Sequence, residues 1–158
     1  MKSQFETTIA DLWRALGMAP PRFAAENRIV LQVDGDAVVL REAPDAQHVL
    51  IVGRAGELAR EAQRSAEQVS DILRANLANA SGFSACVSLE NADSETPEVV
   101  VQGRYAYRDR NIEKLAAQIQ EVAHLRGIHG ARLSGVVRTS NSLSHLADID
   151  SEATIFRP

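Results

Sequence analysis

The chain has 158 residues, of which 45% are hydrophobic and 4% aromatic, and it carries 17 basic against 21 acidic side chains. This length fits one domain of ordinary size, and a formal net charge of −4 argues against a protein whose main partner is a nucleic acid. No apolar run approaches the roughly 20 residues that a membrane-spanning helix needs, and the single cysteine, Cys86, rules out an internal disulfide framework.

An amphipathic helix is expected near the N-terminus. Ser3 followed by Glu6 forms a capping box, in which each side chain satisfies the other residue's free backbone N–H. Gly17, with Pro20 and Pro21 after it, ends the helix. Between these signals, apolar side chains recur at helical spacing: Phe5, Ile9, Leu12, Trp13 and Leu16.

Three short strands are expected next, over residues 28–33, 37–41 and 48–52. An Asp-Gly pair at 34–35 lies between the first two apolar runs and is typical of a β-hairpin. A turn that contains Pro44 separates the second strand from the third. Connections this short force the neighbouring strands to be antiparallel.

A long second helix is expected over residues 57–80. Its apolar stripe consists of Leu58, Ala62, Ala66, Val69, Leu73 and Leu77. The alanines of this stripe allow another backbone to approach closely but bury little area. The stripe therefore predicts either packing within one subunit or a contact between two copies related by a two-fold axis.

Two further strands are predicted over residues 83–89 and 99–107. A third helix follows, with Asp109 or Asn111 as its cap and its end near Gly127. The resulting order is helix, three strands, helix, two strands, helix. This order predicts an α+β domain built around a twisted antiparallel sheet.

The first 130 residues are interpreted as one domain and residues 131–158 as a C-terminal extension. Residues 145–156 of the extension fit either a short helix or a flexible tail. Glu6 and Asp11 stand where a secretory signal peptide needs its apolar core, which argues against export by that route.

The sequence carries no catalytic, cofactor or metal signature. It has neither a glycine-rich phosphate loop nor a G-x-S-x-G, H-E-x-x-H or C-x-x-C motif. His124 falls away from the apolar stripe of the third helix, and Cys86 alternates onto a polar face with no base nearby. Four acidic residues in one loop match no calcium site: Glu90, Asp93, Glu95 and Glu98. We therefore expect no enzymatic activity, no cofactor and no metal.

The first three strands are apolar on both faces, whereas a sheet with one face in water should alternate. Val30 lies on the opposite face of its strand from Ile29 and Leu31. In the next two strands, Val39 and Leu50 likewise lie on the opposite face from their apolar neighbours. Two interpretations remain open at this point. Either the first helix covers the second face, or that face receives another polypeptide.

The order of elements resembles the class I type III secretion chaperones, the CesT/Tir chaperone family, from about Phe5 to Ile128. Four segments carry this resemblance: the amphipathic start FETTIADLWRALGM, the hairpin RIVLQVDGDAVVLRE, the third strand HVLIVGRAG and the long helix ELAREAQRSAEQVSDILRANL. The hairpin of the last two strands and the third helix complete it.

The resemblance implies a homodimer in the bacterial cytoplasm, without enzymatic activity. It also implies that the protein binds the N-terminal region of one or more secreted effectors in extended form and keeps them soluble and secretion-competent. The implied effector-binding residues are Leu12, Trp13, Leu16, Val30, Val39, Leu50 and Val52. The implied dimer residues are Val69, Leu73, Leu77, Val87 and Leu89. A secretion ATPase is a further candidate partner. The alternative is an interaction or regulatory module of related fold that binds a folded bacterial partner.

Overall fold

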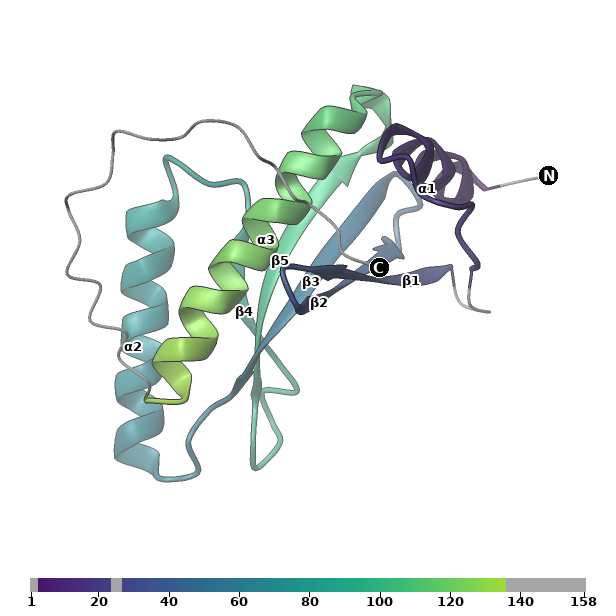
Figure 1. Ribbon diagram of the computed structural model, residues 1–158. Helices are drawn as coiled ribbons and strands as arrows, with labels where there is room; N and C mark the ends of the chain where they lie inside the picture. Colours follow the sequence, from purple (N-terminus) through teal and green to yellow (C-terminus); the bar gives the residue numbers. More distant parts are fainter. Residues whose placement is uncertain (1–2, 24–26, 136–158) are drawn as a thin grey trace.

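The computed structural model describes residues 3–23 and 27–135, and within them the elements follow the expected order (Figure 1). All five strands form one antiparallel sheet in the order β1-β2-β3-β5-β4. The elements are α1 (Gln4–Ala15), β1 (Arg28–Val33), β2 (Asp36–Glu42), β3 (His48–Glu57), α2 (Ala62–Asn79), β4 (Cys86–Glu90), β5 (Glu98–Ala106), the 3-10 turn η1 (Tyr107–Asp109) and α3 (Ile112–Leu133). The predicted α+β class and element order are confirmed.

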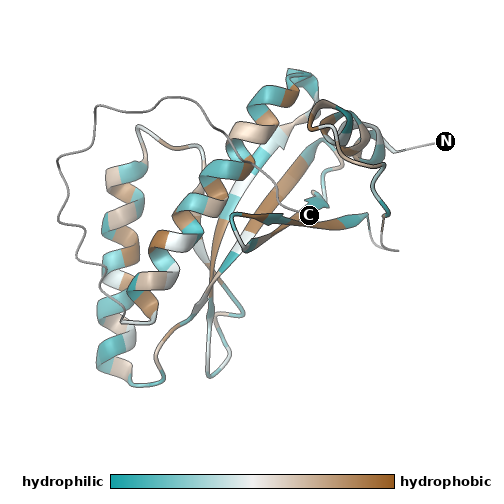
Figure 2. Ribbon diagram, in the orientation of Figure 1, coloured by the Kyte–Doolittle hydropathy of each residue, from teal (hydrophilic) through white to brown (hydrophobic). Residues whose placement is uncertain are grey.

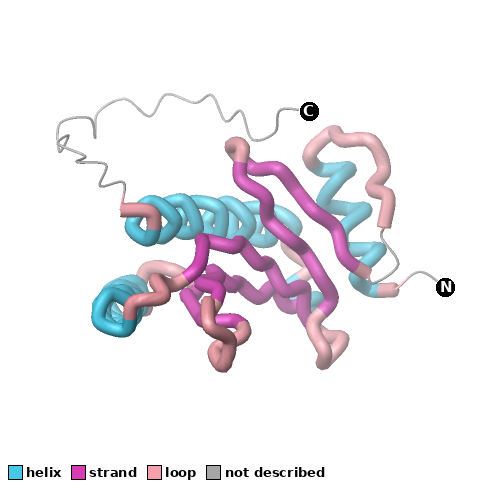
Figure 3. Tube along the Cα trace, turned by 90° about the horizontal axis from the view of Figure 1, so that it is seen from below, coloured by secondary structure: helices cyan, strands magenta, loops and turns pink. Residues whose placement is uncertain are grey.

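One hydrophobic core joins α1, α3 and one face of the sheet. Helix α3 lies across β2, β3 and β5, and α1 packs beside α3 (Figure 1). Ile51 of β3 and Tyr105 of β5 lie on this face and are fully buried. Figure 2 shows the most hydrophobic colours on the strands behind α3. Helix α2 stands apart, at the β4 edge, as Figure 3 also shows.

Helix α1 forms as its sequence predicts. The Ser3 hydroxyl accepts a hydrogen bond from the Glu6 amide at 3.1 Å, and the Glu6 carboxylate accepts one from the Ser3 amide at 3.1 Å. Gly17 follows the helix with φ of +67°, a conformation that glycine adopts without strain. Four side chains of the predicted stripe are buried: Phe5, Ile9, Leu12 and Trp13.

Strand β3 is longer than predicted, and α2 begins later. The chain stays extended to Glu57 because β5 continues beside it, with a register shift between Arg54 and Gly56. The Leu58 amide then donates to the Pro97 carbonyl at 3.0 Å. The predicted helix start at residue 57 is therefore wrong. Leu58 is buried at the end of the sheet and does not belong to the stripe of α2.

Helix α3 also differs from its prediction, since it continues past Gly127 to Leu133. Gly130 lies so close to β3 that a Cβ atom there would be 3.1 Å from the Ala55 carbonyl oxygen. Gly130 permits close packing against β3, and neither Gly127 nor Gly130 ends the helix. At the other end, the Asn111 side chain caps α3 by accepting from the Lys114 amide at 2.9 Å.

Strand β4 begins at Cys86 and not at residue 83, because a side chain of α3 forms hydrogen bonds with the residues just before Cys86. The Glu121 carboxylate accepts hydrogen bonds from the Ala85 amide at 2.6 Å and from the Ser84 hydroxyl at 3.2 Å. Residues 136–158, which hold most of the predicted extension, lie outside the described residues. The boundary at residue 130 stays a prediction. Within the described ranges, no helix is long and apolar enough to cross a bilayer.

Candidate functional site

The sheet has a second face that no described helix covers, and we call it the open face. Side chains alternate between the two faces along a strand. The open face therefore carries the residues that alternate with the ones pointing toward α3. Because α1 and α3 occupy the same side, the sequence interpretation in which α1 covers the second face does not hold. The open face consists of Arg28, Val30, Gln32, Ala37, Val39, Arg41, His48, Leu50, Val52, Arg54, Gln102 and Arg104, whereas Val100 lies on the same side of β5 but is buried.

An apolar row crosses the open face. The strand register places Val30 opposite Val39, and Val39 opposite Val52, so these three side chains lie side by side on neighbouring strands. Val30 is 51% exposed, and Val39 and Val52 are half-buried. Leu50, also half-buried, lies next to the row on β3. A water-accessible apolar row of this kind is available to another chain.

Charged side chains border the apolar row. Arg41 lies beside Leu50 in the register and forms an ion pair with Glu90 of β4 at 3.6 Å. Gln102 donates to the same carboxylate at 3.4 Å. Because both partners of the ion pair are more than a third exposed, it contributes at most about 1 kcal/mol. Since the ion pair joins β2 to β4, its side chains reach over the part of the open face that β3 and β5 form between them.

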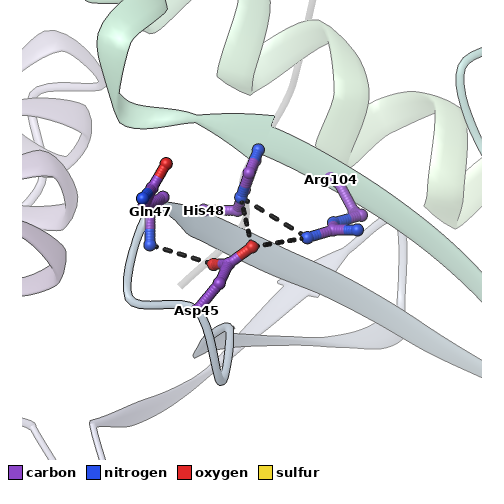
Figure 4. Close-up of polar contacts among 4 residues, drawn as sticks. All are labelled: Asp45, Gln47, His48 and Arg104. Atoms are coloured by element: carbon purple, nitrogen blue, oxygen red, sulfur yellow. Dashed lines mark hydrogen bonds and ion pairs between the residues drawn. The ribbon is translucent and has the colours of Figure 1, made fainter.

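A polar cluster lies where the open face meets the β2–β3 turn (Figure 4). One Asp45 oxygen is 2.8 Å from His48 Nδ1 and 2.8 Å from an Arg104 guanidinium nitrogen. The other oxygen accepts from the Gln47 amide at 2.9 Å. This amide bond above all, then His48 and Arg104, lowers the pKa of Asp45 against the opposing effect of desolvation. Asp45 therefore holds the His48 and Arg104 side chains at the end of the sheet.

The structure separates the predicted effector-binding residues into three groups. Leu12 is fully buried and Trp13 is 5% exposed, so both stabilise the core beneath α1 and offer no surface to a partner. Leu16 is partly buried at the end of α1. The four sheet residues are accessible on the open face: Val30, Val39, Leu50 and Val52. The helical pattern of α1 could not show that its apolar stripe faces inward.

Helix α2 carries a second apolar surface. Leu73 is 63% exposed and Leu77 is 80% exposed, while Ile72 is the one buried residue of this helix. Val69 is half-buried. The stripe predicted from sequence therefore points away from the core along much of its length.

The predicted dimer residues of β4 lie differently from those of α2. Val87 is buried and Leu89 is half-buried within the subunit. The Asn76 side chain donates to the Val87 carbonyl at 2.8 Å and accepts from the Val87 amide at 2.9 Å. Asn76 thus satisfies the β4 backbone at that residue, where an edge strand would otherwise be free to pair.

The described residues contain no group of three or more His, Cys, Asp or Glu side chains that could hold a metal ion. His124 is exposed, as its position on the helix predicts. His129 is buried, and burial, followed by the charge of Arg132, lowers its pKa. Sequence reasoning missed the cluster around Asp45, although the turn beside Pro44 marks its location, since Asp side chains often bind the backbone two residues ahead.

Comparison with known proteins settles the family. Residues 7–126 match the model of the Tir chaperone protein (CesT) family. The chain belongs to this family. Membership places the protein among non-enzymatic chaperones, as the sequence analysis expected. No curated protein matches the chain in sequence.

Three solved structures share the fold. The HopA1–SchA chaperone–effector complex matches with a TM-score of 0.61 and 14% identity, over 78% of this chain and 90% of that chain. The Yersinia pestis type III secretion chaperone SycH, solved with a fragment of YscM2, has a TM-score of 0.57 and 18% identity, over 77% and 96%. YbjN of E. coli, a putative transcription regulator, has a TM-score of 0.52 and 18% identity, over 82% and 92%.

Proposed function

We propose that this protein is a type III secretion chaperone that binds the N-terminal region of one or more effector proteins in extended form. The observation that carries the proposal is the apolar row that no described helix covers. Family membership supports it, as does the fold shared with a chaperone–effector complex and with SycH bound to a YscM2 fragment. The role is to keep the bound segment soluble and competent for secretion.

The open face supplies two kinds of contact for an extended chain. Val30, Leu50 and their neighbours offer apolar area, and each side chain that becomes fully buried contributes about 1 kcal/mol. Strand β1 is an edge strand, so its outer main-chain groups can pair with an added strand. Neither contact requires the partner to fold. Leu16 is partly buried against the core at the end of α1, on the other side of the sheet, so it does not belong to this surface.

The same proposal includes a homodimer formed through α2. Leu73 and Leu77 are too exposed to be explained by packing within one subunit, and their spacing of four puts them on one face of the helix. Contact across a two-fold axis would bury both copies of this stripe. Family membership supports a site of action in the bacterial cytoplasm and delivery of the bound effector to a secretion ATPase.

The proposal can be tested by co-expressing this protein with secreted proteins that are encoded by neighbouring genes. We expect one of them to co-purify with the chaperone and to remain protease-sensitive in its N-terminal region. Leu50→Asp should abolish this co-purification while the circular dichroism spectrum is unchanged. Ala117→Asp, on the exposed side of α3, is the matched control and should retain binding. Retained binding by folded Leu50→Asp would contradict the proposed surface.

The alternative is a regulatory module that binds a folded partner, and the fold shared with YbjN is compatible with this alternative. The two functions differ in the state of the partner. A folded partner would resist limited proteolysis in the complex, whereas an extended segment is cut readily outside its contacts.

A further inference from the structure

A cavity of about 470 Å³ opens at the end of the sheet, where α1 and β3 begin and η1 follows β5. A second cavity of about 340 Å³ adjoins it along α1 and shares Gln4, Tyr107 and Arg110 with the first. The chemistry of the first cavity is set by six side chains: Gln4, Gln47, His48, Tyr107, Arg108 and Arg110.

The lining of the first cavity is cationic, in a chain whose net charge is −4. Arg108 and Arg110 form no ion pair with any residue in the described part of the chain. The carboxylates around the two cavities have partners of their own. Asp11, which lines the second cavity, pairs with Arg14 at 2.7 Å, and Glu42 accepts a hydrogen bond from the Asn27 side chain at 3.0 Å. Asp109 binds Lys114 at 2.6 Å, and Asp45 is held between His48 and the Arg104 guanidinium.

The backbone fixes Arg110 at the mouth of both cavities. Arg110 has a φ of +47°, in the left-handed region, and its amide donates to the Tyr107 carbonyl at 3.3 Å. The next amide, that of Asn111, donates to the Tyr105 hydroxyl at 2.8 Å. Burial, followed by the charges of Glu42 and Asp45, raises the pKa of Tyr107, which lines both cavities.

The cavity is continuous with the open face. His48 lines the cavity and belongs to the open face, where it pairs with Ala106 in the register. Leu50 lies two residues along β3, about 7 Å away, opposite Arg104. A chain that leaves the apolar row along β3 therefore meets first Arg104 and His48, and then the cavity that Arg108 and Arg110 line.

We propose that this cavity binds the acidic side chains of the partner segment that lies on the open face, at the end where that segment passes His48. The inference rests on the proposed function and adds a sequence preference to it: apolar residues followed by Asp or Glu. Guanidinium groups bind carboxylates through paired N–H donors, which suits two arginines at one mouth. A partner segment with acidic residues at that end would complement a local charge of opposite sign.

Synthetic peptides test the preference without knowledge of the natural effector. One peptide alternates Val and Ser and carries three Asp at each end, and its matched peptide carries Asn at those positions. Binding to the full-length protein is measured by fluorescence anisotropy. We expect the Asp peptide to bind roughly tenfold more tightly than the Asn peptide, with the difference shrinking at high salt because both arginines are exposed.

Arginine variants then locate the effect. Arg108→Gln with Arg110→Gln should bring the Asp peptide to the affinity of the Asn peptide and leave the Asn peptide unchanged. Arg60→Gln with Arg64→Gln makes the same change of charge at exposed positions near the start of α2 and should alter neither affinity.

Each other outcome has a definite meaning. Equal affinity of both peptides for the wild type refutes the acidic preference and leaves the proposed function standing. Equal loss of affinity in both double variants also refutes it, because the effect would then be one of net charge. If neither peptide binds the wild type, the open face is not a peptide site, and the proposed function fails with the inference.

Discussion

Removal of the exposed leucines of α2 should dissociate the proposed homodimer. The perturbation is Leu73→Ala together with Leu77→Ala. Alanine has the highest helix propensity, so α2 should remain helical, and neither leucine contributes much to the core of its own subunit. The double variant therefore changes the surface of α2 with little effect on the fold.

The expected magnitude follows from the exposed fractions. Leucine loses about three carbon groups on truncation to alanine, each worth about 0.8 kcal/mol when fully buried. With 63% of Leu73 and 80% of Leu77 available for burial at an interface, the loss is at most about 1.5 and 2 kcal/mol. A two-fold axis applies both losses twice, so the dimer should weaken by up to about 7 kcal/mol.

Sedimentation equilibrium over a range of protein concentrations measures this loss. Even half of the upper value raises the dissociation constant several-hundredfold, which turns a stable dimer into a monomer at micromolar concentration. Val30→Ala, which truncates a 51% exposed side chain on the open face, is the matched control and should remain dimeric. A wild-type monomer, or a double variant with an unchanged dissociation constant, would refute the assignment of α2 as the interface.

Three further predictions concern stability. Glu121→Gln should lower the free energy of unfolding by about 1–2 kcal/mol, measured in urea, because a weaker acceptor replaces the carboxylate that binds the Ala85 amide. Gly53→Ala should destabilise the protein by about 1–3 kcal/mol, since its Cβ would lie 3.1 Å from a side chain of α3; a thermal midpoint equal to that of the wild type would contradict the contact. Burial lowers the pKa of His129, so the unfolded chain takes up its proton first, and stability should fall as pH drops through about 6.5. His129→Leu should reduce that dependence, and exposed His124→Leu should not.

Local signals in the sequence predict the parts of the fold that local interactions hold together. The capping box at Ser3 and Glu6 is reproduced with both hydrogen bonds. The Asp34-Gly35 hairpin forms, with φ of +52° and +86° at its two residues. Strand alternation also predicts correctly that Cys86 points away from the core.

The errors arise where contacts distant in sequence override the local pattern. Leu58 has helical spacing to Ala62, but pairing with β5 keeps its neighbours extended. Gly127 is predicted to end the third helix, but α3 continues to Leu133, where the lack of a side chain at Gly130 permits its close approach to β3. Asp45 and Arg104 are 59 residues apart in sequence, and only the β3–β5 pairing brings them into contact.

The sheet order separates the two surfaces on which the proposal depends. Strand β1, with Val30, forms one edge of the sheet, and β4 forms the other, where α2 presents Leu73. Because β2, β3 and β5 lie between these edges, a substitution at one surface should leave the other intact. Val30→Asp is therefore expected to give a dimer with weakened effector binding, and the α2 double variant a monomer whose open face is unchanged. If both variants lost both properties, dimer formation and effector binding would share one surface, which is incompatible with the assignment of each to an opposite edge.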